Sequence, residues 1–273
     1  MRSILNRLYI GGGALLAASY PFFAERLSVR INTYRIPVRR LPKAFDGFTI
    51  IHLADLHYGP LMSIATLQQV VDQVNRMERD IVVNTGDNVY QHRSTQAVDD
   101  VWPVLSQLSA PLGVYSVLGN HDHWASTSRS LKWLEKSGQN LRHRSVAIEK
   151  NGARIWLGGA GDLMGDEPGV DAAFTGVPDD DCKILLAHNP DTADLPFAAS
   201  VQLVISGHTH GGQVVLPFFG PPVLPVHNRR YASGFVRSEH TDVFISRGVG
   251  STAPIRFNCP AEIAVLKLTP AVE

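Results

Sequence analysis

Two histidines that are separated by one residue, His208 and His210, follow an apolar run and precede two glycines. Four other polar clusters also come directly after apolar runs. Aspartate, asparagine and histidine supply the oxygen and nitrogen donors that divalent cations bind in proteins. The pattern therefore predicts a metal site built from Asp55, His57, Asp87, Asn120, His188, His208 and His210.

The spacing of these residues predicts that they converge. Asp55 and His57, like His208 and His210, stand two apart, and extended backbone would place both members of each pair on one face, with Leu56 and Thr209 facing away. Ligands bind at the carboxyl ends of the strands in open α/β sheets. Each motif alone has a plain structural explanation, but five in order favour one site. We interpret the histidines without this context as structural: His52, His92, His143 and His240.

Alternating apolar segments indicate the elements that carry these motifs. Strands are expected over 48–55, 80–87 and 113–120, and helices over 64–77, 95–109 and 128–137. Ser63 is expected to cap the first helix and Gly138 to end the third. This alternation predicts a largely parallel sheet covered by helices, and hence a mixed α/β fold. The second half is rich in strands, which we expect over 154–162, 183–190, 201–210, 212–217, 242–250 and 262–268.

Composition limits the classes of function. The formal charge is zero and the isoelectric point is about 7.2, so nucleic acid is not an expected partner. The two cysteines, Cys182 and Cys259, form no metal or disulfide motif and are interpreted as small buried side chains. No protein partner is predicted. No linker divides residues 46–273, which we predict to form one catalytic domain.

The N-terminus is apolar and the following segment is basic. Seventeen uncharged residues separate Arg7 from Glu25, which predicts an uncleaved membrane anchor within 1–25; Ala17-Ala18-Ser19 leaves a cleaved signal as the alternative. Residues 26–45 carry six basic side chains and no acidic one before Asp46, as expected of a juxtamembrane segment or of one face of an early strand. We predict association with the inner membrane, and the positive-inside rule favours its cytoplasmic face, whereas a cleaved signal would mean export.

The motifs DLHYG, GDN, GNHD, AHNP and GHTHGG resemble those of the calcineurin-like metallophosphoesterases over residues 48–269. The segments YASGF (231–235) and SRGVGSTAPIRFNCPAEIAVLKL (246–268) resemble more specifically the YkuE/YaeI-type branch of membrane-associated bacterial phosphodiesterases. This resemblance implies a four-layer αββα sandwich, in which two mixed β-sheets are flanked by helices.

The resemblance also implies two divalent metal ions, for which Mn, Fe and Zn all remain open. Asp55, His57 and His210 would hold the first ion, and Asn120, His188 and His208 the second. Asp87 would bridge them. A hydroxide bridging the ions would attack a phosphodiester or pyrophosphate in line. His121 would protonate the leaving oxygen as the catalytic acid, and Asp122 would orient nearby donors.

One residue departs from the family pattern. Tyr90 stands where the family often has an aspartate that supports the histidine of GNH, and a phenol offers no negative charge to that histidine. A weaker acid suits a good leaving group, so a diester or pyrophosphate is favoured over an alkyl monoester. A phosphomonoesterase and a non-catalytic scaffold on the same fold remain the alternatives.

Substrate-binding residues cannot be assigned from a motif. The loop over 216–231 offers Phe218, Phe219, Val223 and Leu224 for an apolar rim and Arg229 and Arg230 for a phosphate, although it would equally suit a loop packed on its own domain. Together with the predicted anchor, this composition permits a phosphorylated small molecule or a lipid-linked substrate. The resemblance suggests UDP-2,3-diacylglucosamine as an example.

Overall fold

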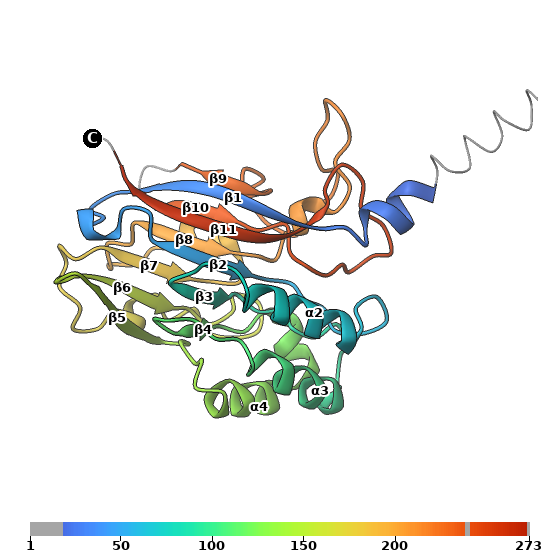
Figure 1. The fold of residues 1–273 in the computed structure, drawn as a ribbon, viewed down its shortest axis with the longest axis horizontal. Coiled ribbons are helices and arrows are strands. Elements are labelled where there is room, and N and C mark those ends of the chain that lie inside the picture. Colours follow the sequence, from blue (N-terminus) through green and yellow to red (C-terminus); the bar gives the residue numbers. More distant parts are fainter. Residues whose placement is uncertain (1–18, 238–240, 272–273) are drawn as a thin grey trace, which may run out of the picture.

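Two mixed β-sheets lie face to face in the computed structural model, which describes residues 19–237 and 241–271 (Figure 1). The first sheet has the order β1-β11-β2-β3-β4. β11 pairs in parallel with β1 and antiparallel with β2, and the pairs β2–β3 and β3–β4 are parallel. The strands are β1 (Val29–Val38), β2 (Thr49–Leu53), β3 (Ile81–Asn84), β4 (Val114–Ser116) and β11 (Ala261–Pro270).

The second sheet has the order β5-β6-β7-β8-β10-β9. Its central pairs, from β6 through β7 and β8 to β10, are parallel, and the outer pairs β5–β6 and β10–β9 are antiparallel. The strands are β5 (Arg144–Lys150), β6 (Ala153–Gly159), β7 (Lys183–Leu186), β8 (Leu203–Ser206), β9 (Gly234–Val236) and β10 (Asp242–Ile245).

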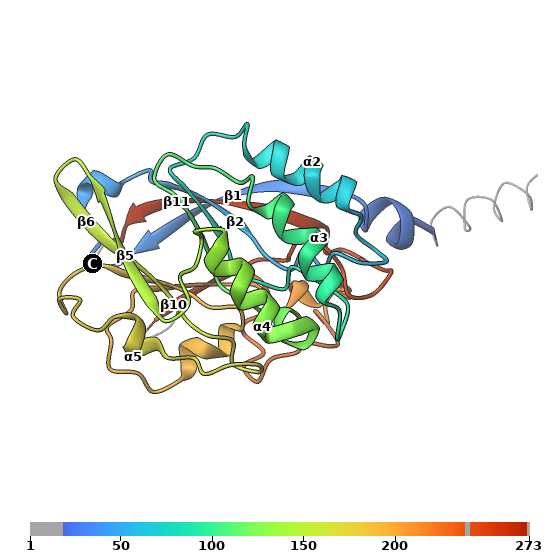
Figure 2. The ribbon, with the colours of Figure 1, turned by 90° about the horizontal axis from the view of Figure 1, so that it is seen from below.

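Helices complete the outer layers. Figure 2 shows α2, α3 and α4 side by side on the outer face of the first sheet. A short helix, α5, and a 3-10 helix, η3, cover part of the second sheet. The helices are α2 (Ile64–Val74), α3 (Thr95–Leu105), α4 (Asn120–Lys136) and α5 (Val170–Ala173), and the short turns are η1 (Pro21–Glu25, a π-helix), η2 (Lys43–Phe45), η3 (Pro190–Asp194) and η4 (His210–Gly212).

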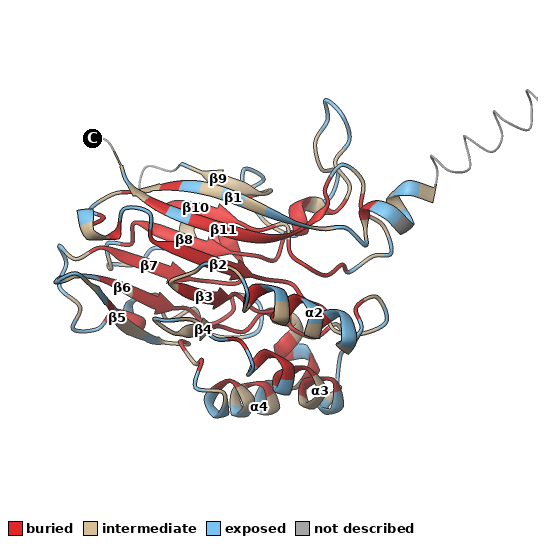
Figure 3. Cartoon of the chain, in the orientation of Figure 1, coloured by how far each residue is buried: buried red, intermediate tan, exposed pale blue. Residues whose placement is uncertain are grey.

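Three apolar clusters hold these four layers together. The cluster between the sheets includes Ile50, Val83 and Phe244, and that between the first sheet and its helices includes Ile51 and Trp102. The third cluster covers the outer face of the second sheet. Each fully buried aliphatic or aromatic side chain contributes about 1.5–3 kcal/mol. The four-layer αββα sandwich with two mixed sheets is therefore confirmed, with a thin fourth layer. Figure 3 shows the strands largely buried, with α2, α3 and α4 on one side of them and partly exposed.

Several element boundaries differ from those expected. The strand predicted over 113–120 is only Val114–Ser116, and the helix predicted over 128–137 begins eight residues earlier, at Asn120. The predicted strand over 212–217 is wrong, because Val214 and Leu216 make only isolated bridges, to Phe257 and to Gly220. Both cysteines are free and buried, as expected.

The basic segment over 26–45 contains strand β1, which is the strand alternative that the sequence left open. β1 pairs with β11 along ten residues, from Val29 beside Ala261 to Val38 beside Pro270, so the sheet extends upstream of residue 46. Most of the predicted anchor or signal, residues 1–18, lies outside the described residues. Within residues 19–237 and 241–271, no helix is long and apolar enough to cross a membrane.

Candidate metal centre

The predicted ligand residues follow the carboxyl ends of parallel strands from both sheets. β2 leads into Asp55 and His57, and β3 leads into Asp87. Asn120 opens α4, which follows β4. In the second sheet β7 leads into His188, and β8 leads into His208 and His210. All of these side chains are buried, and the structure brings them together as the sequence predicts.

The backbone that presents the two pairs, Asp55 with His57 and His208 with His210, is not extended, so the expectation that alternation places each pair on one face is wrong. β2 ends at Leu53 and β8 at Ser206, before the paired residues begin. Five of the seven ligand residues stand in turns and adopt the left-handed region, which costs about 1–2 kcal/mol for a non-glycine residue. The φ angles are 54° at Asp55, 48° at His57, 56° at Asp87, 69° at His208 and 52° at His210.

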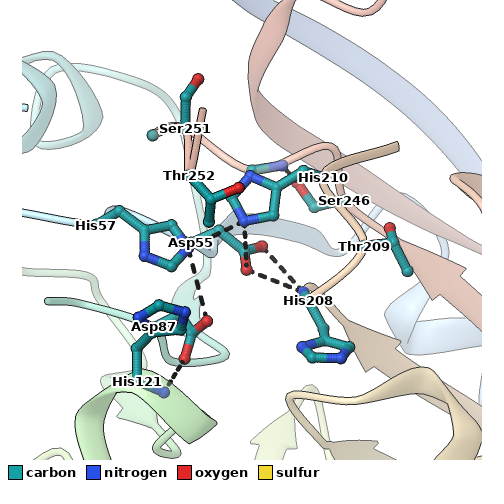
Figure 4. A network of polar contacts seen from close by, with 12 residues as sticks. Asp55, His57, Asp87, His121, His208, Thr209, His210, Ser246, Ser251 and Thr252 are labelled. Atoms are coloured by element: carbon teal, nitrogen blue, oxygen red, sulfur yellow. Dashed lines mark hydrogen bonds and ion pairs between the residues drawn. The ribbon is translucent and has the colours of Figure 1, made fainter. Parts of the chain in front are cut away.

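Asp55, His57 and His210 form the first group of donor atoms. Nε2 of His57 lies 2.9 Å from Nε2 of His210, which in turn lies 3.4 Å from Oδ1 of Asp55 (Figure 4). The backbone N–H of His208 donates to both oxygens of Asp55, at 3.0 and 3.1 Å. Two imidazole nitrogens and a carboxylate oxygen thus face one small buried space, as a divalent cation requires.

Asp87, His188 and His208 form the second group, with Asn120 beside them. Nε2 of His188 lies 3.3 Å from Oδ2 of Asp87, 3.1 Å from Nδ1 of His208 and 3.1 Å from Oδ1 of Asn120. The same Oδ2 of Asp87 lies 3.6 Å from Nε2 of His57. The Asp87 carboxylate therefore stands between the two groups.

Backbone carbonyls fix the orientation of two of these imidazoles. Nδ1 of His188 donates to the carbonyl of Thr85 at 2.9 Å, and Nε2 of His208 donates to the carbonyl of Pro225 at 2.9 Å. A proton on the outer nitrogen leaves the lone pair of the other nitrogen directed toward the donor cluster. The residues present therefore fit divalent cations.

Burial and mutual charge shift the ionisation of this cluster. Burial raises the pKa of Asp55 to about 7, and lowers that of His57 to about 3 and that of His208 to about 4. Burial alone would lower the pKa of His188, but the charge of Asp87 and its hydrogen bond raise it to about 10. The same interaction, against the effect of burial, holds the pKa of Asp87 well below its ordinary range. A bound dication would take over from the His188 proton in balancing the carboxylates.

His121 lies at the edge of the cluster. Its backbone N–H donates to Oδ1 of Asp87 at 2.8 Å, and its Nδ1 donates to the backbone carbonyl of Tyr90 at 3.0 Å. The ring of Tyr90 lies alongside the imidazole, with 5.8 Å between the centroids. The residue that departs from the family pattern thus orients His121 through a neutral carbonyl instead of a carboxylate.

Asp122 orients donors, as predicted from the sequence. Its carboxylate accepts the backbone N–H groups of Asp87, Asn88 and Gly119 at 2.9–3.0 Å. It thereby ties the turn after β3 to the first turn of α4. Burial raises the pKa of Asp122 to about 7, with a further increase from Asp87, whereas these N–H groups act in the opposite direction.

A cavity of about 440 Å³ opens beside the donor cluster. Asp87, His121 and His210 line it together with apolar side chains that include Trp124, Val214, Val223 and Ile255. Trp124 belongs to no motif, and Ile255 lies in the segment 246–268 that resembles the YkuE/YaeI-type branch, but no pattern in the sequence assigns either residue to a cavity.

Only some of the residues proposed for a substrate rim line the cavity. Val223 lines the cavity, but Phe218 and Phe219 point into solvent, with exposed fractions of 105% and 86%. Arg229 donates to the carbonyl of Pro221 at 2.8 Å, and Arg230 to that of Arg237 at 3.0 Å. The two arginines thus brace their own loop.

Of the histidines interpreted as structural, two make structural hydrogen bonds and one lies near the site. Nε2 of His52 bonds Oγ1 of Thr85 at 2.8 Å, and His143 bonds the carbonyl of Glu167 at 2.6 Å. His92 lies nearer the site than expected, with its ring centroid 5.5 Å from that of His121. His240 lies outside the described residues.

Sequence reasoning missed one buried residue next to the centre, Arg256. Its guanidinium is fully buried and donates to the carbonyls of Cys259, Arg247 and Gly250 at 2.6–3.0 Å. It also approaches Nδ1 of His210 at 3.4 Å. The signal was present in the segment SRGVGSTAPIRFNCP, but no local pattern distinguishes a buried arginine from an exposed one.

Comparison with known proteins decides the family. A sequence model described as calcineurin-like phosphoesterase matches residues 48–212, which include all of the predicted ligands. The chain belongs to this family. YkuE of Bacillus subtilis, an uncharacterised metallophosphoesterase, is 32% identical over 266 residues, which cover 95% of this chain and 93% of YkuE. Phosphodiesterase YaeI of Escherichia coli is 30% identical over 81% of this chain and 82% of its own length.

The resemblance seen in the sequence, both to the superfamily and to its YkuE/YaeI-type branch, is therefore confirmed. A transmembrane protein with a metallophosphoesterase domain from Danio rerio is 32% identical over 89% of this chain and 58% of its own length. Calcineurin-like phosphoesterases are metal-dependent phosphohydrolases, and this chain has side-chain groups suited to bind metal. The assignment of each side chain to one of two ions, and of His121 to proton transfer, stays a prediction.

Proposed function

We propose that this protein hydrolyses a phosphodiester or pyrophosphate bond with the help of two divalent cations, Mn, Fe or Zn. The observation that carries the proposal is the position of Asp87, whose Oδ2 lies 3.6 Å from Nε2 of His57 and 3.3 Å from Nε2 of His188. One carboxylate is thus shared between two groups of donors, as expected of a bridging ligand.

Each side chain then has a role. Asp55, His57 and His210 would hold one ion, Asn120, His188 and His208 the other, and Asp87 both. Bound divalent cations lower the pKa of a coordinated water and neutralise phosphoryl oxygens. His121 faces the same cavity and would give a proton to the leaving oxygen, while its Nδ1–H stays on the carbonyl of Tyr90.

The surroundings of His121 support a diester or pyrophosphate over an alkyl monoester. Its Nδ1 bonds a neutral carbonyl, so no carboxylate on that side strengthens it for protonating a poor leaving group. The relative YaeI is named a phosphodiesterase, which agrees with a preference for diesters over monoesters. A phosphomonoesterase of the same family is the competing function.

The cavity supports a substrate with an apolar part. Trp124, Val214, Val223 and Ile255 line the same cavity as Asp87 and His121. A phosphate at the cluster would leave an attached acyl or aryl group against these side chains. We therefore propose a lipid-linked substrate, of which UDP-2,3-diacylglucosamine is one example, and a place at the inner membrane. The positive-inside rule, applied to the sequence, favours the cytoplasmic face.

The test is purification, metal analysis and turnover of bis(p-nitrophenyl) phosphate by the wild type and Asp87→Asn. We expect about two equivalents of metal in the wild type and a loss of at least about 100-fold in kcat with Asp87→Asn. Asp181→Asn is the matched control, because Asp181 bonds Arg154 and Trp156 and does not line the cavity. A wild type that binds no metal and does not hydrolyse the diester would exclude this function and favour a non-catalytic scaffold. An Asp87→Asn variant as active as the control would exclude the function in the form proposed here, in which Asp87 is shared by both ions.

The class of substrate needs a second comparison. We expect kcat/KM to be higher for the aryl diester than for p-nitrophenyl phosphate, and higher again for a diester or pyrophosphate that carries an acyl chain. A preference for the monoester would support the phosphomonoesterase alternative.

A further inference from the structure

The loop that follows the metal-site histidines ends in two fully exposed aromatic residues. Phe218 and Phe219 have exposed fractions of 105% and 86%, with Leu216 at 41% and Val223 at 73% on the same loop. Figure 3 shows this loop projecting from the body of the protein with its outer end exposed. Exposed apolar side chains that gather at one projecting point mark an interaction surface.

The turn that carries these aromatics is built by regular hydrogen bonds. Leu216 and Gly220 exchange backbone hydrogen bonds at 2.9 and 3.0 Å, and the N–H of Phe219 also donates to the carbonyl of Leu216 at 3.2 Å. Phe218 has a φ of 69°, so its side chain is held in a left-handed turn. We call residues 216–220 the aromatic tip.

The charge carried by the loop itself is of one sign, although Asp191 and Asp194 accept hydrogen bonds from its base at residues 227–231. From Gly212 to Arg237 the chain contains three arginines and no aspartate or glutamate. Arg229, Arg230 and Arg237 are all exposed, and Arg229 bonds the carbonyl of Pro221 beside the tip. Aromatic side chains surrounded by basic groups match the interface of an anionic bilayer, where each basic residue adds attraction to the headgroups.

The aromatic tip also lies next to the described start of the chain. Val215 donates to the carbonyl of Phe257, and Arg256 donates to the carbonyl of Pro21 in η1. Tyr20, Phe22 and Leu27, in and around η1, are exposed apolar residues as well. Figure 1 shows both segments projecting from the same end of the molecule. The aromatic tip and η1 are thus two apolar projections joined at residues 256 and 257, and both could contact the same flat surface.

We infer that the aromatic tip inserts Phe218 and Phe219 into the headgroup region of an anionic membrane, as a contact additional to any made by the N-terminus. The base of the same loop, at Val214 and Val223, lines the cavity beside the donor cluster. Insertion therefore sets the cavity mouth at the bilayer surface, within reach of a lipid-linked substrate. The inference rests on the proposed membrane location but not on the hydrolytic chemistry.

The test places an environment-sensitive fluorophore at the tip of the full-length protein through Phe218→Cys. The native thiols, Cys182 and Cys259, are buried, so the new thiol is the accessible one among the described residues. Ala147→Cys, an exposed site on β5, is the matched control. With vesicles of phosphatidylcholine and phosphatidylglycerol, we expect the probe at 218 to shift to the blue, to brighten at least about twofold and to be quenched by a lipid-attached quencher. The probe at 147 should remain unchanged.

A probe at 218 that remains aqueous while the protein sediments with the vesicles would overturn the inference. So would a blue shift without vesicles, because it would identify a second copy of the chain as the occupant. As a second measurement, Phe218→Ser/Phe219→Ser should weaken vesicle binding about tenfold, since burying one aromatic side chain corresponds to at least that factor. An unchanged affinity would also contradict it.

Hydrolysis of bis(p-nitrophenyl) phosphate in buffer separates this inference from the proposed function. We expect the double serine variant to hydrolyse this soluble diester at the wild-type rate, because neither phenylalanine lines the cavity. Absence of hydrolysis in both proteins would contradict the proposed function, and the probe result would still decide whether the tip inserts.

Discussion

Gly119 lies against the donor cluster so closely that one added methyl group should displace it. A Cβ at this position would stand 2.7 Å from the backbone nitrogen of Asp87 and 2.8 Å from Cε1 of His188, and still closer to Oδ1 of Asp87. Gly119 has φ −107° and ψ 178°, which alanine adopts without strain. The effect of Gly119→Ala is therefore steric, with no contribution from the backbone.

The magnitude follows from these distances. Carbon needs about 3.5 Å from its neighbours, so Asp87 and His188 must move by nearly 1 Å. A displacement of that size costs on the order of 100-fold in rate, and overpacking costs about 1–3 kcal/mol in stability. The melting temperature should fall by about 2–4 °C for each kcal/mol.

The assay combines metal content, kcat for bis(p-nitrophenyl) phosphate and thermal unfolding. Gly59→Ala is the control, because its Cβ would meet the Cβ of Tyr90 at 3.1 Å, where a small shift suffices. We expect Gly59→Ala to retain metal and to stay within a few-fold of the wild-type rate. A Gly119→Ala variant with wild-type metal content and kcat would refute the packing that the structure gives to the second donor group.

Three further outcomes are expected. Arg256→Met should destabilise the protein by about 3 kcal/mol or more in urea unfolding, because three buried carbonyls lose their donor; a change below about 1 kcal/mol would contradict this. Removal of metal by a chelator should lower the melting temperature, and a metal concentration of 100 times Kd should restore about 2.7 kcal/mol; identical melting curves would argue against a metal centre. Burial raises the pKa of Asp166, but its hydrogen bonds with Arg142 and with the N–H of Glu167, together with the charges of Arg142 and His123, hold that pKa below its ordinary value. The ionised Asp166 carboxylate therefore contributes fully to the free energy of unfolding above about pH 4. This contribution is lost as the pH falls through the lower pKa that Asp166 has in the folded protein. The stability difference between the wild type and Asp166→Asn should accordingly shrink below pH 4, and a difference that grows there would be inconsistent.

The convergence of the site could be predicted because sheet topology requires it. Parallel strands such as β2 and β3, or β7 and β8, bring their carboxyl ends to one edge. If the apolar runs are parallel strands, the polar residues that directly follow them therefore lie at the same edge of the sheet. The prediction needed only the strands' existence and order, and errors of a few residues at their boundaries did not affect it.

The local geometry could not be predicted in the same way. The helix predicted over 128–137 begins at Asn120, because Asp122 caps the first turn by accepting the N–H of Gly119. The sequence GNHDHW contains little apolar periodicity. The start of this helix depends on capping and on the position of Asn120 at the site, so periodicity could not predict it. The run at 212–217 looked like a strand, but Val214 and Leu216 find only isolated partners.

Arg256 illustrates a different limit. Three of the five partners of its guanidinium are backbone carbonyls, and backbone atoms are the same in every residue; the other two are Oγ of Ser251 and Nδ1 of His210. No pattern of side-chain types can therefore reveal that this arginine is buried while Arg247, only nine positions earlier, is not. Such residues are found only when the path of the chain is known.

The left-handed backbone of the ligand turns leads to one more prediction, which concerns the energy stored at the centre. Asp55 has a φ of 54°, where alanine is strained and glycine is not. Asp55→Ala and Asp55→Gly both remove the carboxylate. The difference between their free energies of unfolding in the metal-free protein therefore measures the backbone strain alone. We expect the glycine variant to be more stable by about 1 kcal/mol. At Asp72, in the last turn of α2, the order should reverse, because glycine weakens a helix. Equal stabilities at position 55 would mean that its turn carries no strain. If the order is as expected, folding holds the ligands in an unfavourable conformation that metal binding must offset.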